Sequence, residues 1–363
     1  MPTPLSRSAA RLSLLSSLVL PLVLAAGAAS VGAAEPVGGP RLGSAGIVVG
    51  AGSPTLPATV AAGWLVADLD TGDVLGGKNP HGRFAPASTL KALTALTLIP
   101  RLDVHREVTP TYDDVNADGS RVGLVESVPY PVSQLFTAML VVSGNDAANT
   151  LATANGGVPA TVAQMNARAR QLQAYDTFAA TPNGLDAPGQ RSSPYDLALI
   201  ARAAMDLPDF RHYVATKHSR IRGLHGKTIA ISSHDKLLYN YPGAIGIKNG
   251  FTVAARATFI GAATRNGHTL VVTLMHTAPR YWPEAAALLD WGFAAEKAGA
   301  TPVGTLVGPQ GTAGPAVAAV GDVRAASALP AAGRRRDRFP VLPVALLTSG
   351  LGAAGYLVRR RFT

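Results

Sequence analysis

Strand-like segments at two distant places restrict the fold of this chain more than any other feature of its sequence. We interpret residues 64–68 as an alternation of apolar and polar side chains, which a turn signal at 70–73 interrupts and which restarts at 74–75; this predicts a hairpin. Far along the chain, residues 257–275 contain two apolar, β-branched runs that Asn266-Gly267 joins, the strongest short signal for a hairpin. These strands can form one sheet only if the two distant parts of the chain meet.

The segment between the two predicted hairpins has mostly helical spacing of its apolar residues. We expect helices at five places: 88–99, 132–140, 146–154, 162–172 and 194–205. A sheet built from both ends of the chain, with helices inserted between them, predicts an α+β fold. We expect a two-lobed body over residues 55–298, in which an antiparallel sheet flanked by helices meets an all-helical insertion. A cleft between two such lobes is a natural place for a site.

The first 34 residues have the pattern of an export signal. Arg7 and Arg11 precede a mostly apolar run to about Ala26, and small residues follow up to Ala34. We expect residues 1–34 to be a signal peptide, with an uncleaved anchor helix as the alternative.

The end of the chain contains a second apolar segment. Residues 339–358 carry no charge, and as a helix they would span about 30 Å, the thickness of a bilayer core. We expect a transmembrane helix there, a cytoplasmic tail at 359–363 and the body on the outer, cell-wall side. The Ala/Gly/Pro-rich residues 299–338 predict a linker, with a last edge strand within 302–307 as the alternative.

Charge and cysteine content exclude several classes of function. Nine arginines in the first eleven and last thirty residues, less Asp337, account for +8 of the net charge of +10. A nearly neutral body is a poor footprint for nucleic acid, so we expect no nucleic-acid partner. The absence of cysteine excludes disulfides, thiolate zinc sites and a cysteine nucleophile.

Three short motifs carry residues suited to catalysis. Ser88 and Lys91 stand three apart at the start of a predicted helix, which places a hydroxyl beside a potential base. Ser143 and Asn145 lie between two predicted helices, where a hydroxyl can relay a proton; alternatively Asn145 only caps a helix. Lys248 lies between two glycines beside a strand, where a substrate can approach closely; alternatively this is an ordinary bulge.

Together the motifs stand in the order S-x-x-K, S-x-N and K-x-G, and the chain resembles the penicillin-recognising serine hydrolases. Residues 86–91, 143–149, 183–186 and 241–248 are similar to low-molecular-weight D-alanyl-D-alanine carboxypeptidases, over about residues 55–295. The resemblance implies a β-lactamase/transpeptidase-like fold and a substrate that is a peptidoglycan stem peptide ending in D-Ala-D-Ala. It also implies β-lactam antibiotics as covalent inhibitors, and neither metal nor cofactor.

The resemblance implies roles for four residues in the reaction. Ser88 would attack the penultimate D-Ala carbonyl, with Lys91 as its general base. The backbone N–H groups of Ser88 and Phe251 would form an oxyanion hole. Ser143 would relay a proton to the departing D-Ala.

Five further residues would bind the substrate on the same analogy. Asn145 would hold the peptide backbone, and Lys248, Asn249, Thr252 and Arg256 would surround the terminal carboxylate. Asn249 departs from the family, which usually has Thr or Ser at this position.

Several alternatives share the scaffold. A class A β-lactamase needs a deacylating glutamate soon after the S-x-N motif, and the only later glutamates are Glu284 and Glu296. D,D-endopeptidase or transpeptidase activity remains open, as does an inactive, membrane-tethered scaffold that binds the wall.

Overall fold

The protein is described here by a computed structural model, which covers residues 35–310. Its central element is a seven-stranded sheet in the order β1-β3-β2-β10-β9-β8, with β11 also paired to β3. All of these pairings are antiparallel. The strands are β1 (Ile47–Val49), β2 (Gly63–Asp68), β3 (Asp73–Lys78), β8 (Ala244–Thr252), β9 (Arg256–Arg265), β10 (His268–Thr277) and β11 (Gly304–Thr305).

The centre of the sheet forms where the two distant predicted hairpins meet. Strand β2 pairs with β10, and Trp64 lies opposite Leu274. The expected hairpins are confirmed as β2–β3 and β9–β10, and the antiparallel α+β body is confirmed with them.

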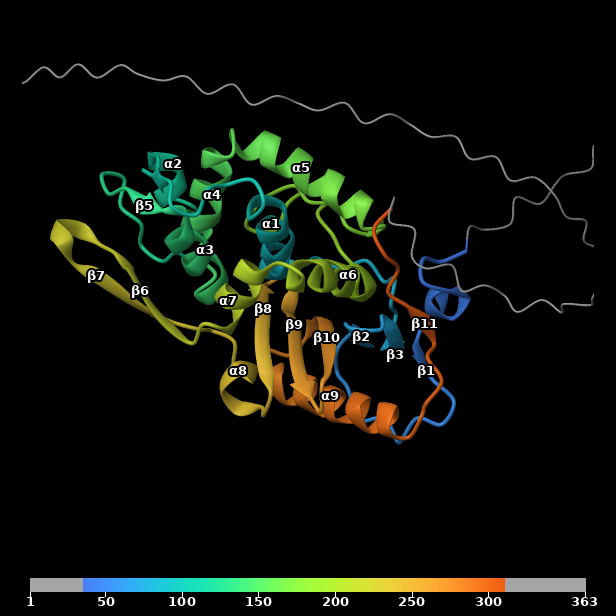
Figure 1. Cartoon of the computed structure of the whole chain (residues 1–363). Coiled ribbons are helices and arrows are strands. Elements are labelled where there is room, and N and C mark those ends of the chain that lie inside the picture. The colour runs from blue at the N-terminus through green and yellow to red at the C-terminus, as the bar shows by residue number, and fades with distance from the viewer. Residues whose placement is uncertain (1–34, 311–363) are drawn as a thin grey trace, which may run out of the picture. The chain divides into compact units, whose positions relative to one another are not determined.

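Both faces of the sheet are buried. Successive side chains of β2 therefore enter two different apolar cores, one on each face. Leu65 and Ala67 belong to the core on one face, and Trp64 and Val66 to the core on the other. Helix α9 (Trp282–Lys297) packs against one face, and α6 (Pro194–Met205) covers the other (Figure 1). The half-polar pattern expected for β2 is therefore wrong, because helices cover both sides.

Helices dominate the segment between β3 and β8, as expected. They are α1 (Lys91–Leu98), α2 (Tyr112–Val115), α3 (Val132–Val141), α4 (Asn145–Ala154), α5 (Val158–Gln171), α6, α7 (Pro208–Ala215) and α8 (Leu237–Asn240). Short 3₁₀ turns are η1 (Pro40–Gly43), η2 (Ala87–Leu90) and η3 (Leu224–Gly226).

The insertion also contains β structure, which corrects the expectation that it is all helical. Strands β4 (Glu107–Val108) and β5 (Tyr130–Pro131) form a small pair. Strands β6 (His218–Arg222) and β7 (Thr228–Ser232) form a hairpin that extends away from the sheet and helices in Figure 1.

The expected body of residues 55–298 is too narrow at both ends. Strand β1 lies before residue 55 and β11 lies after residue 298, and each hydrogen-bonds to β3. Residues 304–305 are thus an edge strand rather than linker, which agrees with the alternative for 302–307. The short β11 is held by Arg202 of α6, whose guanidinium donates to the carbonyl oxygens of Leu69, Asp70 and Leu306.

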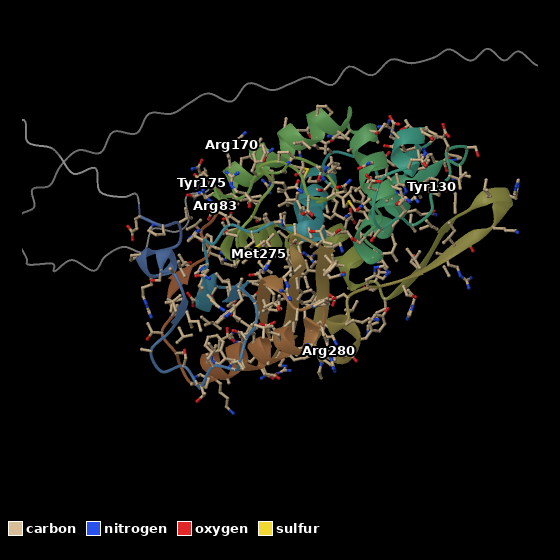
Figure 2. The ribbon with its side chains drawn as sticks, turned by 180° about the vertical axis from the view of Figure 1, so that it is seen from behind. Arg83, Tyr130, Arg170, Tyr175, Met275 and Arg280 are labelled. Atoms are coloured by element: carbon tan, nitrogen blue, oxygen red, sulfur yellow. The ribbon has the colours of Figure 1, made fainter. Side chains whose placement is uncertain are left out.

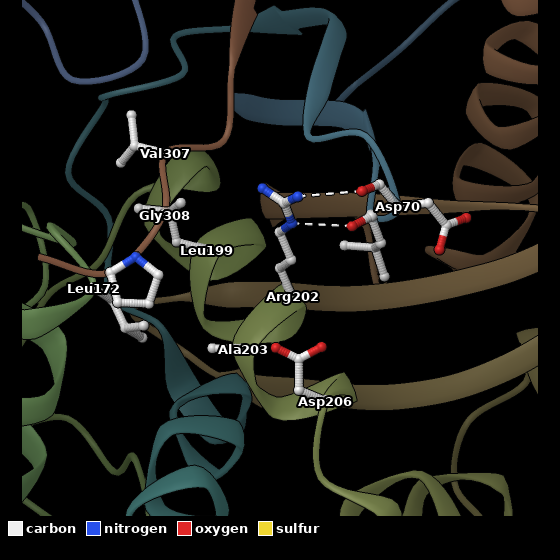
Figure 3. Close-up of a pocket in the computed structure, with 10 residues that line it drawn as sticks. Asp70, Leu172, Leu199, Arg202, Ala203, Asp206, Val307 and Gly308 are labelled. Atoms are coloured by element: carbon white, nitrogen blue, oxygen red, sulfur yellow. Dashed lines mark hydrogen bonds between the residues drawn. The ribbon is translucent and has the colours of Figure 1, made fainter. Parts of the chain in front are cut away.

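Figure 3 shows two of these hydrogen bonds of Arg202 inside a cavity of about 390 Å³ between α6 and residues 307–309. The guanidinium ties β2, the β2–β3 turn and the end of the domain together there. This cavity lies against structural residues, and none of the residues expected at the site lines it.

Within residues 35–310, no helix is long and apolar enough to cross a membrane. The expected signal peptide, the transmembrane helix at 339–358, the tail at 359–363 and the linker beyond residue 310 lie outside the described residues.

Candidate active site

Ser88 and Lys91 lie one turn apart, and their side chains are in contact. The Nζ atom of Lys91 is 2.9 Å from the Oγ atom of Ser88. Residues Ala87–Leu90 form a 3₁₀ turn, and α1 begins only at Lys91, so the expected α-helix from Ser88 starts three residues late. The 3₁₀ geometry, with about 120° per residue, stacks positions i and i+3 directly and brings the pair closer together.

The turn that carries Ser88 is fixed by its neighbours. The Oγ1 atoms of Thr89 and Thr258 both donate to the carbonyl oxygen of Pro86, at 2.6 and 2.8 Å. A Cβ atom on Gly250 would come within 2.7 Å of the Ser88 nitrogen. Strand β8 therefore packs directly against the backbone at Ser88, and only glycine leaves room for this approach.

Lys91 is completely buried, and its surroundings favour the neutral amine. Burial lowers the pKa of Lys91 well below its usual value, the charge of Lys248 lowers it further, and Asp146 opposes them. Besides Ser88, Nζ contacts the Oδ1 atom of Asn145 and the carbonyl oxygen of Asn183, each at 2.6 Å.

These contacts orient the amine. Both amide oxygens can only accept hydrogen bonds, so they take the two hydrogens of a neutral amine. The remaining lone pair then points toward the Ser88 hydroxyl, the arrangement that a general base requires.

Asn145 is held for this contact. Its Nδ2 atom donates to the carbonyl oxygen of Asp118 at 2.6 Å, which fixes Oδ1 toward Lys91. The residue that caps α4 is Gly144, and no side chain caps this helix. The alternative that Asn145 only caps a helix is therefore wrong.

Ser143 occupies the turn between α3 and α4. Its backbone is in the left-handed region (φ 62°), and the residue is only 6% exposed. Asp146, one turn later, accepts the backbone N–H groups of Val122, Gly123 and Leu124, which tie the preceding loop to this turn.

Lys248 is the second buried lysine. It lies on β8 after a bulge between Ala244 and Gly246, so the bulge expected as an alternative is present together with the lysine. Burial lowers the pKa of Lys248 to about 7, and Asp235 partly opposes this. Its Nζ atom donates to the backbone oxygen of Asn249 at 2.7 Å and lies 3.5 Å from the Oδ1 atom of the same residue.

The other expected residues lie at the end of β8 and the start of β9. Phe251 is 57% exposed, and the hydroxyl of Thr252 donates to Asp186 at 3.0 Å. Arg256 begins β9 in a left-handed conformation (φ 55°), directly opposite Thr252. The Thr252 hydroxyl, expected to bind substrate, is thus engaged by an acidic side chain.

Three residues that contribute to the site were given no role from the sequence. Asn183 acts through its backbone oxygen and Asp146 through backbone amides, so neither role depends on a recognisable side-chain motif. Asp235 lies two residues before Leu237, is 4% exposed and has one oxygen without a hydrogen-bond partner. Burial raises its pKa to about 6. In the sequence, a single Asp in a turn that starts a helix does not indicate that it will be buried.

Two groups of side chains could hold a metal among the described residues, and both lie outside this site. They are Asp68, His268 and Glu296, and His81, Asp176 and Asp196. In the second group, both ring nitrogens of His81 already make hydrogen bonds, to Asp176 and to the Val37 oxygen.

Comparisons with known proteins show the family to which the chain is similar. A family model described as D-alanyl-D-alanine carboxypeptidase, Peptidase S11, matches residues 51–278. The D-alanyl-D-alanine carboxypeptidase DacB2 of Mycobacterium tuberculosis is 45% identical over 251 residues, which cover 67% of this chain and 86% of that protein. The carboxypeptidase DacD of Salmonella typhimurium is 34% identical; 66% of this chain matches 64% of DacD, less than two thirds of its length.

A solved structure supports the fold. The crystal structure of a D-alanyl-D-alanine carboxypeptidase from M. tuberculosis H37Rv superimposes with a TM-score of 0.67 at 44% identity. The match covers 72% of this chain and 99% of that one.

Proposed function

Because the chain belongs to the D-alanyl-D-alanine carboxypeptidase family of serine peptidases, we propose that it removes the terminal D-Ala from peptidoglycan stem peptides through Ser88. Penicillin then acylates the same serine. The observation that carries this proposal is the contact between Ser88 and a buried Lys91 whose hydrogens are taken by two amide oxygens.

The reaction follows from these positions. Lys91 accepts the proton of Ser88 while Oγ bonds to the carbonyl carbon of the penultimate D-Ala. The backbone N–H groups of Ser88 and Phe251 stabilise the oxyanion. The C–N bond to the terminal D-Ala breaks, and Ser143 passes a proton to the departing amine. Water then hydrolyses the ester and restores Ser88.

Substrate binding uses the remaining site residues. Asn145 holds the peptide backbone through its amide. Lys248 faces the terminal carboxylate with Asn249, Thr252 and Arg256, once Thr252 has exchanged its bond with Asp186 for one with substrate.

The β-lactamase alternative lacks support from the described residues. Glu284 accepts from the amides of Val60 and Ala61 and from the Thr277 hydroxyl, so it is a structural residue. Glu296 lies near the end of α9, close to Asp68 rather than to Ser88.

Mass spectrometry of the protein tests the nucleophile. After incubation with penicillin, the wild type should gain the mass of one penicillin, and with a pentapeptide it should release D-Ala. Ser88→Ala should do neither, whereas Ser127→Ala, at an exposed serine, should do both. A penicillin adduct on Ser88→Ala would refute the assignment. Lys91→Ala should slow acylation by roughly a thousandfold or more.

We also propose that residues 1–34 direct export and residues 339–358 anchor the body at the outer side of the cell membrane. The charge-free 20-residue run and the arginines after it support this. A chain ending at Gly333 should be exported, soluble and able to bind penicillin. A full-length protein that external protease cannot reach in protoplasts would contradict the proposed topology.

A further inference from the structure

Three side chains that can bind a metal lie together where helix α9 ends. They are Asp68, His268 and Glu296, and one donor atom of each lies within 4.8 Å of the others. We call them the α9 cluster. Asp68 is the last residue of β2, His268 is the first residue of β10, and Glu296 is the last but one of α9. The cluster therefore brings together the ends of three different elements.

The sheet places Asp68 beside His268. Side chains alternate along a strand, so Asp68 lies on the same face of β2 as Val66, which belongs to the core under α9. Asp68 pairs with Leu270 of β10, and His268 lies two residues before Leu270 on the same face. A carboxylate thus stands where the apolar run of this face ends, with an imidazole diagonally opposite.

Helix α9 brings Glu296 to the same place. The helix lies close to the sheet at Gly292, where a Cβ atom would come within 2.8 Å of the side chains of Val66 and Leu270. Glu296 follows Gly292 by four residues, so it lies on the same face of the helix, one turn later. Its carboxylate therefore faces the end of β2, where Asp68 is located.

The spacing within the α9 cluster fits a metal better than a hydrogen bond. The Nδ1 atom of His268 is 3.5 Å from the Oδ2 atom of Asp68. An N–H···O hydrogen bond usually spans about 2.7–3.2 Å, whereas two ligands on a tetrahedral zinc ion are about 3.4 Å apart. Asp68 is 2% exposed, and its Oδ1 atom accepts the N–H groups of Asp70 and Thr71, which fixes the direction of Oδ2.

The second group of possible ligands lacks this open spacing. There an oxygen of Asp176 lies 2.7 Å from the Nδ1 atom of His81, the length of a hydrogen bond. Arg83, labelled in Figure 2, donates to the other oxygen of Asp176 at 2.9 Å. That carboxylate is already satisfied, and a metal would have to displace its partners.

The α9 cluster is accessible, and its charge suits a cation. His268 and Glu296 line a groove of about 550 Å³, which leaves room for water as a further ligand. The two carboxylates balance the charge of one divalent ion when the imidazole is neutral. Lys297 and Arg265 line the same groove and oppose a cation. Arg265 is paired with Asp290 at 2.8 Å, and the exposed Lys297 can turn toward solvent.

We propose that the α9 cluster binds one divalent transition-metal ion, for which Zn²⁺ is the best fit. One imidazole nitrogen and two carboxylate oxygens suit Zn²⁺, whereas Mg²⁺ and Ca²⁺ prefer oxygen ligands alone. Water completes the tetrahedron. The ion ties the ends of β2, β10 and α9 together and so stabilises the domain. The proposed reaction at Ser88 gives these three residues no role, so the metal site holds or fails independently of it.

Calorimetry with metal-free protein tests the site. The wild type should bind one Zn²⁺ per chain, and Mg²⁺ and Ca²⁺ should bind far more weakly. His268→Ala and Glu296→Gln should each weaken Zn²⁺ binding about a hundredfold or more, because even the loss of a group that only supports a ligand costs about tenfold to a hundredfold. Glu126→Gln, at an exposed acid outside the cluster, should bind Zn²⁺ as the wild type does.

Thermal unfolding separates a metal site from a merely structural cluster. Saturating Zn²⁺ should raise the unfolding temperature of the wild type and of Glu126→Gln by several degrees, and should not raise that of either cluster variant. Without metal, Glu296→Gln should unfold at no lower temperature than the wild type, because it removes one of two facing carboxylates. A lower unfolding temperature of metal-free Glu296→Gln would indicate a structural role instead.

Two results would overturn the proposal. One is a wild type that binds no Zn²⁺ or binds Ca²⁺ more tightly. The other is a Zn²⁺ affinity and an unfolding shift that survive in both cluster variants. Far-UV circular dichroism confirms that each variant is folded, and the side chain of His268 is 59% exposed, so its removal should leave the fold intact.

Discussion

Lys91 and Lys248 need opposite charge states for the proposed reaction, although both are buried. Lys91 must be neutral to accept a proton, and burial lowers its pKa well below its usual value, which favours that state. Lys248 must be charged to attract a carboxylate, and burial lowers its pKa to about 7. As pH rises through about 7 Lys248 loses its charge, so the rate of acylation should fall on the alkaline side.

A substitution can show whether Lys248 causes this fall in the acylation rate at alkaline pH. Lys248→Arg should move the fall to higher pH, because a guanidinium stays charged throughout. The measurement is the second-order rate constant for penicillin between about pH 5.5 and 9.5, with folding checked at each pH. A fall that stays in place in Lys248→Arg would exclude Lys248 as its source.

Asn249 offers a second test at this scale. An amide is a longer donor than the usual hydroxyl, and its oxygen already lies 3.5 Å from Lys248. We expect the carboxylate to be held less tightly by about 1 kcal/mol, the worth of one hydrogen bond. Asn249→Thr should therefore raise acylation and peptide turnover roughly fivefold. An unchanged or slower variant would show that the amide donates as well as a hydroxyl.

The sequence identified the residues whose side-chain type shows their chemistry. Ser88, Lys91 and Asn145 were predicted, and the structure joins all three by hydrogen bonds. Asn183 was not assigned a role, because a backbone oxygen is common to every residue. Asp235 was missed because its importance comes from burial, which only the tertiary fold creates.

At the scale of elements, local turn signals predicted the hairpins well. Elements that depend on packing or pairing with distant parts of the chain were harder to predict. The Asn266-Gly267 turn predicted β9–β10, and the turn at 70–73 predicted β2–β3. Helix α9 was missed because its sequence is rich in alanine and apolar on most sides, which weakens the periodic signal. Strand β1 was not assigned, and β11 was expected only as an alternative, because each is too short to show a pattern and pairs only with β3.

The close approach of β8 to the 3₁₀ turn makes Gly250 a testable position. A Cβ atom there would lie 2.7 Å from the Ser88 nitrogen and 2.6 Å from the Thr258 hydroxyl. Gly250→Ala should displace β8 and slow penicillin acylation by about tenfold to a hundredfold, because small displacements at a reacting centre are costly.

A matched glycine substitution controls for loss of backbone freedom. At Gly223, in the β6–β7 hairpin, a Cβ atom would meet its nearest neighbour at 3.3 Å, on the flexible Ile229 side chain. Gly223→Ala should keep acylation near the wild-type rate. Equal rates for the two alanine variants would show that β8 does not restrain Ser88.

At the scale of the whole domain, a buried acid to which the proposed reaction assigns no role should make stability depend on pH. Asp196 is 1% exposed, and one of its oxygens has no partner. Burial raises the pKa of Asp196 to about 7, with help from the charge of Asp176. Above the unfolded pKa the folded state binds the extra proton, so stability falls as pH rises from about 4 to about 7.

His81 adds a change of the same sign. Burial lowers its pKa, but its bonds with Asp176 and the Val37 oxygen outweigh burial, so the net pKa is raised. The stability that His81 contributes is therefore also lost as pH rises through its folded pKa.

Asp196→Asn removes the acid and should flatten this dependence. Between pH 5 and 8 the unfolding temperature of the wild type should fall by several degrees more than that of the variant. Asp206→Asn, an exposed position at the end of the same helix, should behave as the wild type does. Parallel curves for all three proteins would show that Asp196 does not carry the effect.

The pairing of β2 with β10 also sets an order of events during synthesis. A ribosome releases Ser88, Lys91 and Asn145 early, while β8 and β10 are made long afterwards. Until they arrive, β2 has no partner on one side, and the turn at Ser88 lacks the packing of β8. A growing chain therefore carries its nucleophile in an unfinished, inert form and gains both activity and penicillin sensitivity only when nearly the whole domain exists. Completion waits on the slowest class of contacts, those between residues far apart along the chain.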